Sequence, residues 1–236
     1  MSTRLAVIPA RGGSKRIPEK NIRQFAGRPM IAHTLEVARA SGLFDVIHVS
    51  TESERIAGIA AALGFPVAFL RPAQLADDHT PLMPVLRYDA EAFMARGRNF
   101  DEVWMLMACA PLIEPDDLRQ AAALFAKAGG RHPVLPVAPF PAPVEWAFRM
   151  DGAGNLTPLQ PSAMGVRSQE LETKYYDTGT FCALPSQLVL DSAGAGDFAG
   201  YIGYPLDRAK AVDIDDEDDW EFAEIVFAGQ RARGRS

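Results

Sequence analysis

Residues 9–21 read PARGGSKRIPEKN and gather several donor groups in one short segment. Two adjacent glycines, Gly12 and Gly13, let a backbone turn sharply and bring its N–H groups against a ligand. Ser14 adds a hydroxyl, and four cations lie within ten residues, namely Arg11, Lys15, Arg16 and Lys20. Such a loop suits a polyanion of roughly three phosphates. The alternative is a solvent-exposed basic turn that joins a strand to a helix.

Residues 213–219 read DIDDEDD and place six acids in seven positions. We expect a strand to end here, which would turn Asp213 and Asp215 to one face while Ile214 packs into the sheet. Two carboxylates together with nucleotide phosphates are ligands that Mg²⁺ usually accepts, because this ion keeps several of its waters. We therefore interpret Asp213 and Asp215 as metal ligands. The alternative is that these acids cap a following helix, with Asp215 or Asp216 as its N-cap.

Other kinds of site and partner lack their sequence signatures. The chain contains neither the GxxxxGK[ST] loop of P-loop NTPases nor the GxGxxG of dinucleotide-binding proteins. Cys109 and Cys182 form no CxxC pair, which argues against structural zinc and a disulfide framework. A net charge of −6 argues against general binding of nucleic acid or membrane surfaces. The apolar run in residues 1–10 is too short for a signal peptide or a membrane span, so we expect a cytoplasmic protein.

Strand and helix signals alternate in the first half of the chain and would position these groups. The hydrophobic pattern predicts strands at residues 5–9, 45–50, 65–70 and 102–107. It predicts helices at residues 29–40, 53–63, about 82–97 and 116–128. This order indicates an α/β fold with a mainly parallel sheet and helices on both faces. Ligands of such folds bind beyond the carboxyl ends of the strands, where both charged segments would lie.

The composition changes between residues 132 and 161, where seven prolines make a helix nearly impossible. We expect short edge strands there, for instance around residues 144–150, with a turn at 151–155. We interpret the chain as one domain, residues 1–236, with an inserted β-rich arm at about 132–178 that serves subunit contact. The core would resume with strands near 179–184 and 210–214, and would end in a helix through Trp220, Ala223 and Phe227.

Several segments, taken together, resemble one family. The chain is similar to the cytidylyltransferases that activate nonulosonic acids, namely the acylneuraminate (CMP-sialic acid) synthetases and the pseudaminic acid cytidylyltransferases. The likeness runs from residue 5 to about 222. It is carried in order by IPARGGSKRIPEKN, VSTESERIA, LRPAQLADDHT, APLIEPDDL, RSQEL, YYDTGTF and DIDDEDDW. The resemblance implies a Rossmann-like nucleotidyltransferase (nucleotide-diphospho-sugar transferase) fold, a homodimer formed through the inserted arm, and a need for Mg²⁺.

The resemblance also implies roles for individual residues. The segment expected to bind the phosphates and ribose of CTP comprises Ala10, Arg11, Gly12, Gly13, Ser14, Lys15, Lys20 and Asn21. Cytosine would be bound by Arg71, Thr80 and Leu82. The expected sugar-binding residues are Met107, Arg167, Gln169, Tyr176, Thr178 and Cys182, with Arg167 facing the sugar carboxylate. Asp213 and Asp215 would hold the metal, and the expected catalytic residues are Arg11, Lys20 and Asp215.

Two segments depart from the sialic acid branch of the family. That branch typically has LQPTSPL where residues 106–112 read LMACAPL, so Met107 replaces a glutamine that contacts the sugar. It has NGAIY where residues 178–182 read TGTFC. The pseudaminic branch, with a DAGQFY-like motif and DDxT, is closer to YYDTGTF and DDHT, although Thr180 and Cys182 depart from it too. The expected acceptor is therefore of the pseudaminic acid type, with N-acetylneuraminate or another acidic sugar such as Kdo as alternatives.

The expected reaction is attack by the anomeric hydroxyl of a nine-carbon acidic sugar on the α-phosphorus of CTP, with release of pyrophosphate, for cell-surface glycan synthesis. Catalysis would consist mainly of positioning and charge stabilisation. A protein of another class, a nucleotide-binding module without activity, stays open as an alternative, although Lys20, Asp213 and Asp215 argue against it. The expected partners are CTP, the sugar and a second copy of the chain, without nucleic acid or membrane.

Overall fold

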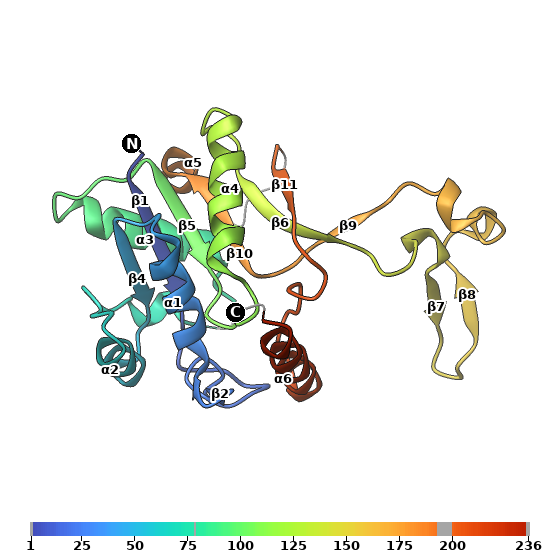
Figure 1. Cartoon of the computed structure of the whole chain (residues 1–236), viewed down its shortest axis with the longest axis horizontal. Coiled ribbons are helices and arrows are strands. Elements are labelled where there is room, and N and C mark those ends of the chain that lie inside the picture. The colour runs from blue at the N-terminus through green and yellow to red at the C-terminus, as the bar shows by residue number, and fades with distance from the viewer. Residues whose placement is uncertain (1, 78, 193–199, 235–236) are drawn as a thin grey trace.

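A seven-stranded sheet lies at the centre of the computed structural model, which describes residues 2–77, 79–192 and 200–234 (Figure 1). The strands follow the order β11-β6-β10-β5-β1-β4, and β9 pairs with β6 beside this path. Their bounds are β1 (Arg4–Pro9), β4 (Val46–Ser50), β5 (Glu102–Leu106), β6 (Val134–Pro139), β9 (Tyr175–Asp177), β10 (Phe181–Pro185) and β11 (Ile202–Pro205).

Five of these strands point the same way. β1 pairs in parallel with β4 and with β5. Because β10 is antiparallel to both β5 and β6, and β11 is parallel to β6, strands β6 and β11 share the direction of β1. Within the described part of the chain, only β9 and β10 run against the others. The predicted α/β fold with a mainly parallel sheet is therefore confirmed.

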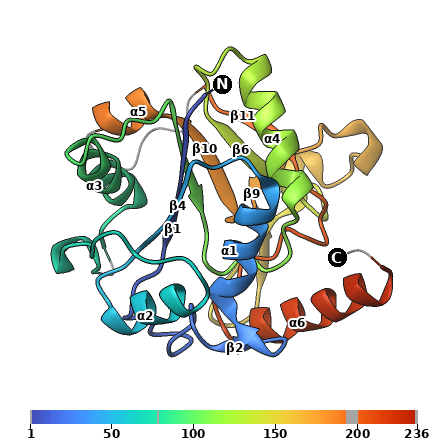
Figure 2. The same cartoon turned by 60° about the vertical axis from the view of Figure 1, so that its left-hand side comes forward.

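Helices cover both faces of the sheet (Figure 2). The side chains of β1 alternate between them, since Leu5 and Val7 pack with α3 and α5 while Ala6 and Ile8 pack with α1 and α4. The helices are α1 (Met30–Ser41), α2 (Glu54–Ala62), α3 (Leu82–Met94), α4 (Pro115–Lys127), α5 (Ser186–Asp191) and α6 (Glu217–Ala232). Among the residues that the structure describes, no helix is long and apolar enough to cross a bilayer.

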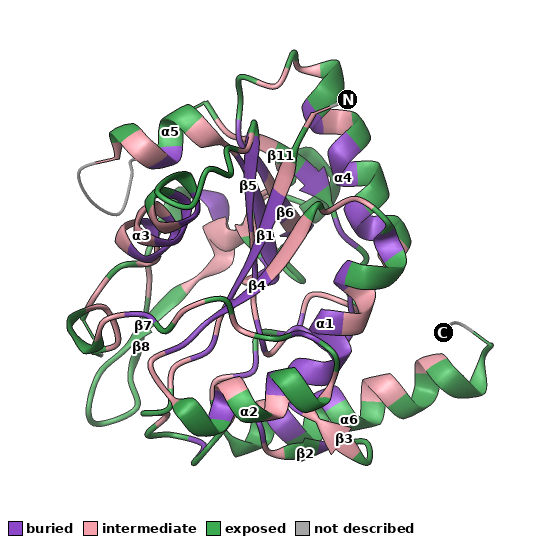
Figure 3. Ribbon diagram, turned by 90° about the vertical axis from the view of Figure 1, so that its left-hand side faces the viewer, coloured by how far each residue is buried: buried purple, intermediate pink, exposed green. Residues whose placement is uncertain are grey.

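A third group of buried residues joins α6 to the segment between β1 and α1, and Figure 3 shows α6 beside β2 and β3. Helix α6 packs against the small hairpin of β2 (Gln24–Phe25) and β3 (Arg28–Pro29), with the rings of Phe25 and Trp220 5.4 Å apart. Ile17 and Ile214 belong to the same cluster. This packing brings the basic segment at residues 11–20 and the acidic segment at residues 213–219 to the same end of the molecule.

An arm projects from the body between β6 and β9 (Figure 1). Its tip is an antiparallel hairpin of β7 (Phe148–Met150) and β8 (Leu156–Pro158), closed by a turn in which the Asp151 carboxylate accepts bonds from Ala153 and Asn155. The strand predicted near residues 144–150 is confirmed only for Phe148–Met150, because Val144–Trp146 form a short 3-10 helix, and the turn at 151–155 is confirmed. The ends of the expected arm of 132–178 differ, because β6 and β9 both belong to the main sheet.

Two predicted strands are wrong. Residues 65–70 form no strand, because Phe65 packs with the α1 face of the sheet and Phe69 with the α3 face, as in an irregular connection. Residues 210–214 form none either, since their buried side chains belong to the cluster around α6 instead of the sheet. Strand β11 was not predicted, because its four residues include a glycine and a proline, which are both depleted in strands.

Candidate active site

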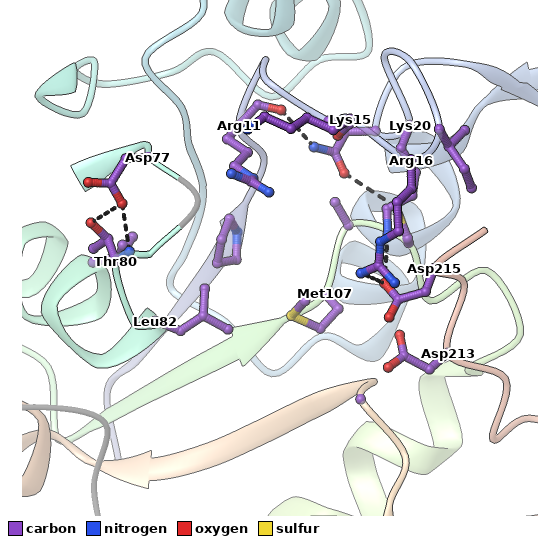
Figure 4. Close-up of a pocket in the computed structure, with 18 of the residues that line it drawn as sticks. Arg11, Lys15, Arg16, Lys20, Asp77, Thr80, Leu82, Met107, Asp213 and Asp215 are labelled. Atoms are coloured by element: carbon purple, nitrogen blue, oxygen red, sulfur yellow. Dashed lines mark hydrogen bonds and ion pairs between the residues drawn. The ribbon is translucent and has the colours of Figure 1, made fainter. Parts of the chain in front are cut away.

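A cavity of about 310 Å³ opens beyond the carboxyl ends of β1 and β5 (Figure 4). Three groups of side chains that are far apart in the sequence line it. They are the cations and polar groups of the segment after β1, a second group comprising Arg71, Leu75, Asp77, Thr80, Leu82 and Val85, and the acids before α6. Residues 107–109 after β5 and Gly179 complete the lining. Predicted site residues that line the cavity are Arg11, Ser14, Lys15, Lys20, Asn21, Arg71, Thr80, Leu82, Met107, Asp213 and Asp215.

The segment after β1 is irregular and is held in place from within. The Asn21 side chain donates from Nδ2 to the carbonyl of Arg11 (3.0 Å), and its Oδ1 accepts from the Cys109 thiol (3.3 Å). The Gly12 N–H donates to the Glu52 carboxylate (2.7 Å), and a Cβ at Gly12 would lie 3.3 Å from that same oxygen. A glycine at position 12 therefore lets the backbone of this segment come close to the loop after β4.

Predicted residues of this segment thus fall into two groups. Arg11, Ser14, Lys15, Lys20 and Asn21 line the cavity. Three others, Ala10, Gly12 and Gly13, contribute no lining side chain but form the backbone between them. Neither glycine has a positive φ angle, so neither makes a left-handed turn. Close approach requires a glycine only at Gly12, because a Cβ at Gly13 would meet nothing within 4 Å.

Asp213 and Asp215 face the cavity from the opposite side, and Ile214 between them is fully buried (Figure 4). The expected alternation therefore exists without a strand. The Asp215 carboxylate lies 2.9 Å from Arg16 Nη2 and 3.5 Å from Lys20 Nζ. Lys20 Nζ also donates to the Ile214 carbonyl (2.5 Å), which ties the basic segment to the acidic one.

The other acids of the cluster cap α6. Asp216 is the N-cap and accepts from the Asp219 N–H (3.0 Å), while the Asp219 carboxylate accepts from the N–H groups of Asp215 and Asp216. This capping box corresponds to the alternative stated for the acidic segment, namely that its acids cap the following helix. It applies to Asp216 and Asp219, whereas Asp213 and Asp215 direct their carboxylates into the cavity.

The two cavity-facing carboxylates form a fitting donor set for a divalent cation. Partial burial raises the pKa of the Asp213 carboxyl, and the negative charge of Asp215 raises it further, so a cation between them would relieve both effects. No group of three or more His, Cys, Asp or Glu side chains in the described ranges could hold a metal by itself. Two carboxylates beside a basic loop suit Mg²⁺ that shares its ligands with phosphates and water.

The third wall contains a buried arginine. The Arg71 side chain is only 3% exposed, and its Nη2 lies 3.3 Å from the Glu52 carboxylate. Its Nε is buried and has no hydrogen-bond partner among the described residues, while the residue as a whole contributes to the cavity lining. Nearby, the Asp77 carboxylate accepts from the Thr80 hydroxyl and backbone N–H, and these bonds lower the pKa of Asp77. Asp78 of the same DDHT motif lies outside the described residues.

Of the residues expected to bind the sugar, Met107 lines the cavity and the others do not. Arg167 and Gln169 are exposed on the projecting arm. The Tyr176 ring lies 5.2 Å from that of Phe140 at the base of the arm. Two further residues are buried: Thr178 bonds to Thr180, and Cys182 packs in the core on the α3 face, where burial raises its pKa.

Arg16, one of the four cations of the basic segment, also lines the cavity. Several further lining residues were not predicted, namely Pro9, Ile17, Leu75, Asp77, Val85, Ala108, Cys109 and Gly179. Asp77 stands inside a quoted motif, so its charge was a usable signal. Gly179 stands in TGT, where glycine signals a special backbone. Burial raises the pKa of the Cys109 thiol to about 12, so at neutral pH it is a packed thiol and not a nucleophile.

Comparisons with known proteins agree with this geometry. The sequence model of the family described as Cytidylyltransferase matches residues 5–138. A pseudaminic acid cytidylyltransferase of Campylobacter jejuni is 33% identical over 229 residues, which cover 94% of this chain and 95% of that protein. A CMP-N,N′-diacetyllegionaminic acid synthase of Legionella pneumophila is 31% identical over 227 residues, with 94% and 95% covered.

A solved structure shows the same fold. The CMP:2-keto-3-deoxy-manno-octonic acid synthetase complexed with CTP superposes with a TM-score of 0.69 at 16% identity, covering 97% of this chain and 100% of that one. At this identity the likeness concerns the fold alone. The family match and the two relatives carry the assignment. This chain belongs to the cytidylyltransferase family.

Proposed function

We propose that this protein transfers CMP from CTP to the anomeric hydroxyl of a nine-carbon acidic sugar in the cytoplasm and releases pyrophosphate. The observation that carries the proposal is one cavity in which the cations of residues 11–20 face Asp213 and Asp215, with a buried arginine, Arg71, in the third wall. The relatives named for pseudaminic and legionaminic acid support an acidic sugar as acceptor.

In the proposed reaction, the anomeric oxygen of the sugar forms a bond to the α-phosphorus of CTP. The bond from that phosphorus to the oxygen of the β-phosphate breaks, and pyrophosphate leaves with the electron pair while the hydroxyl gives up its proton. Lys20 and Arg11 hold the phosphates and stabilise the charge that develops there. Arg71 orients the cytosine through its inward-facing donors. Because these groups are fixed before the substrate arrives, catalysis rests on positioning.

Mg²⁺ is the proposed cofactor, and Asp213 and Asp215 are its proposed protein ligands. When bound, the ion would neutralise negative charge on the phosphates. Asp215 also lies beside Arg16 and Lys20, so the two carboxylates and the basic segment face the same point in the cavity. This arrangement explains why acids and phosphate-binding cations stand on opposite walls.

The proposed acceptor is a pseudaminic-type sugar. Met107 lines the cavity where the sialic acid branch has a glutamine, so the polar groups of N-acetylneuraminate would be left without partners at a cost of about 1–3 kcal/mol each. We expect kcat/KM for pseudaminic acid to exceed that for N-acetylneuraminate at least about tenfold. A panel of acidic sugars, assayed for pyrophosphate, measures this ratio. Equal or better use of N-acetylneuraminate would refute the sugar assignment and leave CMP transfer untouched.

Arg167 provides the second part of that test. We propose that its guanidinium pairs with the sugar carboxylate, which both sugars carry, and a lysine cannot reproduce the bidentate pairing. Arg167→Lys should therefore lower kcat/KM for both sugars. Arg131→Lys, a change at an exposed arginine outside both the arm hairpin and the cavity lining, is the control and should change neither. Indifference to Arg167→Lys would remove this arginine from the sugar site.

We further propose a homodimer in which the arm contacts a second copy. A two-stranded hairpin cannot bury its apolar face alone, and the arm exposes large apolar side chains, including Met150 (69%) and Leu156 (59%). Pairing through a two-fold axis would cover these residues. In its own subunit Arg167 lies on the arm, outside the cavity lining, so the proposed sugar contact requires that it reach the cavity of the partner subunit.

Charge on the hairpin should abolish the dimer. Light scattering at micromolar concentration should give twice the chain mass for the wild type and a monomer for the double variant Met150→Glu/Leu156→Glu, because a buried unpaired carboxylate opposes association. Ile225→Glu on α6, where the side chain is 70% exposed, is the matched control and should stay dimeric. A monomeric wild type with full activity would contradict the proposal.

A further inference from the structure

The turn at Gly179 lies directly against the Asp213 carboxylate. A Cβ added to Gly179 would stand 2.9 Å from Asp213 Oδ2 and 3.0 Å from its Cγ, closer than side-chain contacts allow. We infer that Gly179 is a positioning residue, whose missing side chain sets the place of the Asp213 carboxylate in the cavity. The φ angle of Gly179 is +62°, which L-residues rarely adopt, so its backbone and its contact both favour glycine.

The turn itself has little freedom to move away. The Thr178 hydroxyl donates to the Pro136 carbonyl (3.1 Å) and is 2.9 Å from the hydroxyl of Thr180. The Thr180 carbonyl accepts from the N–H of Met107 (2.8 Å), at the end of β5. Both threonines are at least 98% buried. These bonds anchor the turn to two strands of the main sheet, on either side of Gly179.

The segment that carries Asp213 is fixed as well. Its neighbours Val212 and Ile214 are 8% and 0% exposed and pack in the cluster around α6. Upstream, Lys210 Nζ lies 2.8 Å from the carboxylate of Asp117, which is itself buried at the start of α4. Two anchored backbones thus meet across Gly179, and a methyl group between them would push the Asp213 side chain out of its place.

This inference rests on the proposed function for its consequence. If Asp213 is a metal ligand, Gly179 decides how close that carboxylate comes to Asp215, and so where the cation stands relative to the phosphates. The glycine touches no reacting atom in this account. It acts through Asp213, and a methyl group there should weaken metal binding although both carboxylates are retained.

A thermal stability cycle tests the contact without any ligand. Gly42→Ala is the matched control, because Gly42 has nearly the same φ angle (+67°) and nothing within 4 Å of an added Cβ. We expect Gly179→Ala to lower the Tm by about 2 °C more than Gly42→Ala does, because the methyl group displaces the Asp213 side chain. In an Asp213→Ala background this excess should disappear, since the atoms that collide are gone. Equal losses for the two glycines, or an excess that persists without the carboxylate, would overturn the inference.

A second measurement separates the inference from the proposed function. Binding of Mn²⁺, used as a paramagnetic substitute for Mg²⁺, is followed in the presence of a non-hydrolysable CTP analogue. Gly179→Ala should weaken Mn²⁺ at least about tenfold and Gly42→Ala should not. Unchanged Mn²⁺ affinity in Gly179→Ala would overturn the positioning role. A wild type that binds no Mn²⁺, together with the predicted stability cycle, would support the contact and refute the proposed metal site.

Discussion

Lys20→Ala should reduce kcat/KM by a factor of about 10² or more, because one ammonium group serves both the phosphates and the charge that develops on them. The structure adds that Lys20 Nζ donates to the Ile214 carbonyl and lies 3.5 Å from Asp215. The lysine therefore also holds the basic segment against the acidic one. The loss should fall on the rate at saturating CTP as well as on KM.

Steady-state kinetics with purified protein measure this effect. Lys20→Met, which keeps the apolar stem, separates lost charge from lost packing and should be nearly as slow as the alanine variant. Lys127→Ala, at an exposed position in the last turn of α4, is the control and should have wild-type kinetics. Folding, followed by circular dichroism, should be retained in all three. Near-normal turnover by Lys20→Ala would remove Lys20 from the phosphate site.

Asp215→Asn should abolish most of the Mg²⁺-dependent activity, with a loss of about 10²-fold or more, because it removes a charge from the proposed cation site and keeps the shape of the side chain. Raising the metal concentration should restore activity only in part. Asp213→Asn should behave similarly. The measurement is the initial rate as a function of Mg²⁺ concentration, which reports both the maximal rate and the half-saturating metal.

Two neighbouring acids provide the contrast. Asp216→Asn alters the N-cap of α6, which asparagine can also occupy, so both stability and activity should change little. Asp216→Ala should lower the free energy of unfolding by about 0.5–2 kcal/mol and leave the metal dependence unchanged. If the Asp213 and Asp215 variants behaved like Asp216→Ala, losing stability but keeping activity, all these acids would serve only the helix.

Local patterns sufficed where an element depends on its own side chains. The strand predicted at residues 5–9 and the helices predicted at 29–40 and 53–63 are confirmed as β1, α1 and α2. Local patterns gave wrong predictions where apolar residues pack outside the main sheet. Val212 and Ile214 look like a strand but pack around α6, whereas β11, with a glycine and a proline among four residues, lacks strand propensity and forms through pairing with β6.

The same contrast holds for the cavity. Its charged walls could be predicted because the sequence carries them as two compact motifs, and the basic one directly follows β1, beyond whose carboxyl end ligands of such folds bind. The sugar side could not be placed this way. Thr178 and Cys182 belong to the same sequence motif as the lining residue Gly179, but their own side chains are buried outside the cavity. Arg167 lies on the arm, away from the cavity. The contact of Gly179 with Asp213 joins residues 34 positions apart and leaves no local signal.

Phosphorus NMR of the purified protein with CTP, Mg²⁺ and pseudaminic acid follows the proposed transfer of CMP itself. The three CTP signals should be replaced by those of pyrophosphate and one phosphodiester of CMP, formed in equal molar amounts. No turnover should occur when the sugar is omitted, and Asp215→Asn should react at a strongly reduced rate. Hydrolysis of CTP without sugar, or CTP that stays unchanged with every acidic nine-carbon sugar supplied, would contradict the proposed transfer of CMP to an acidic sugar.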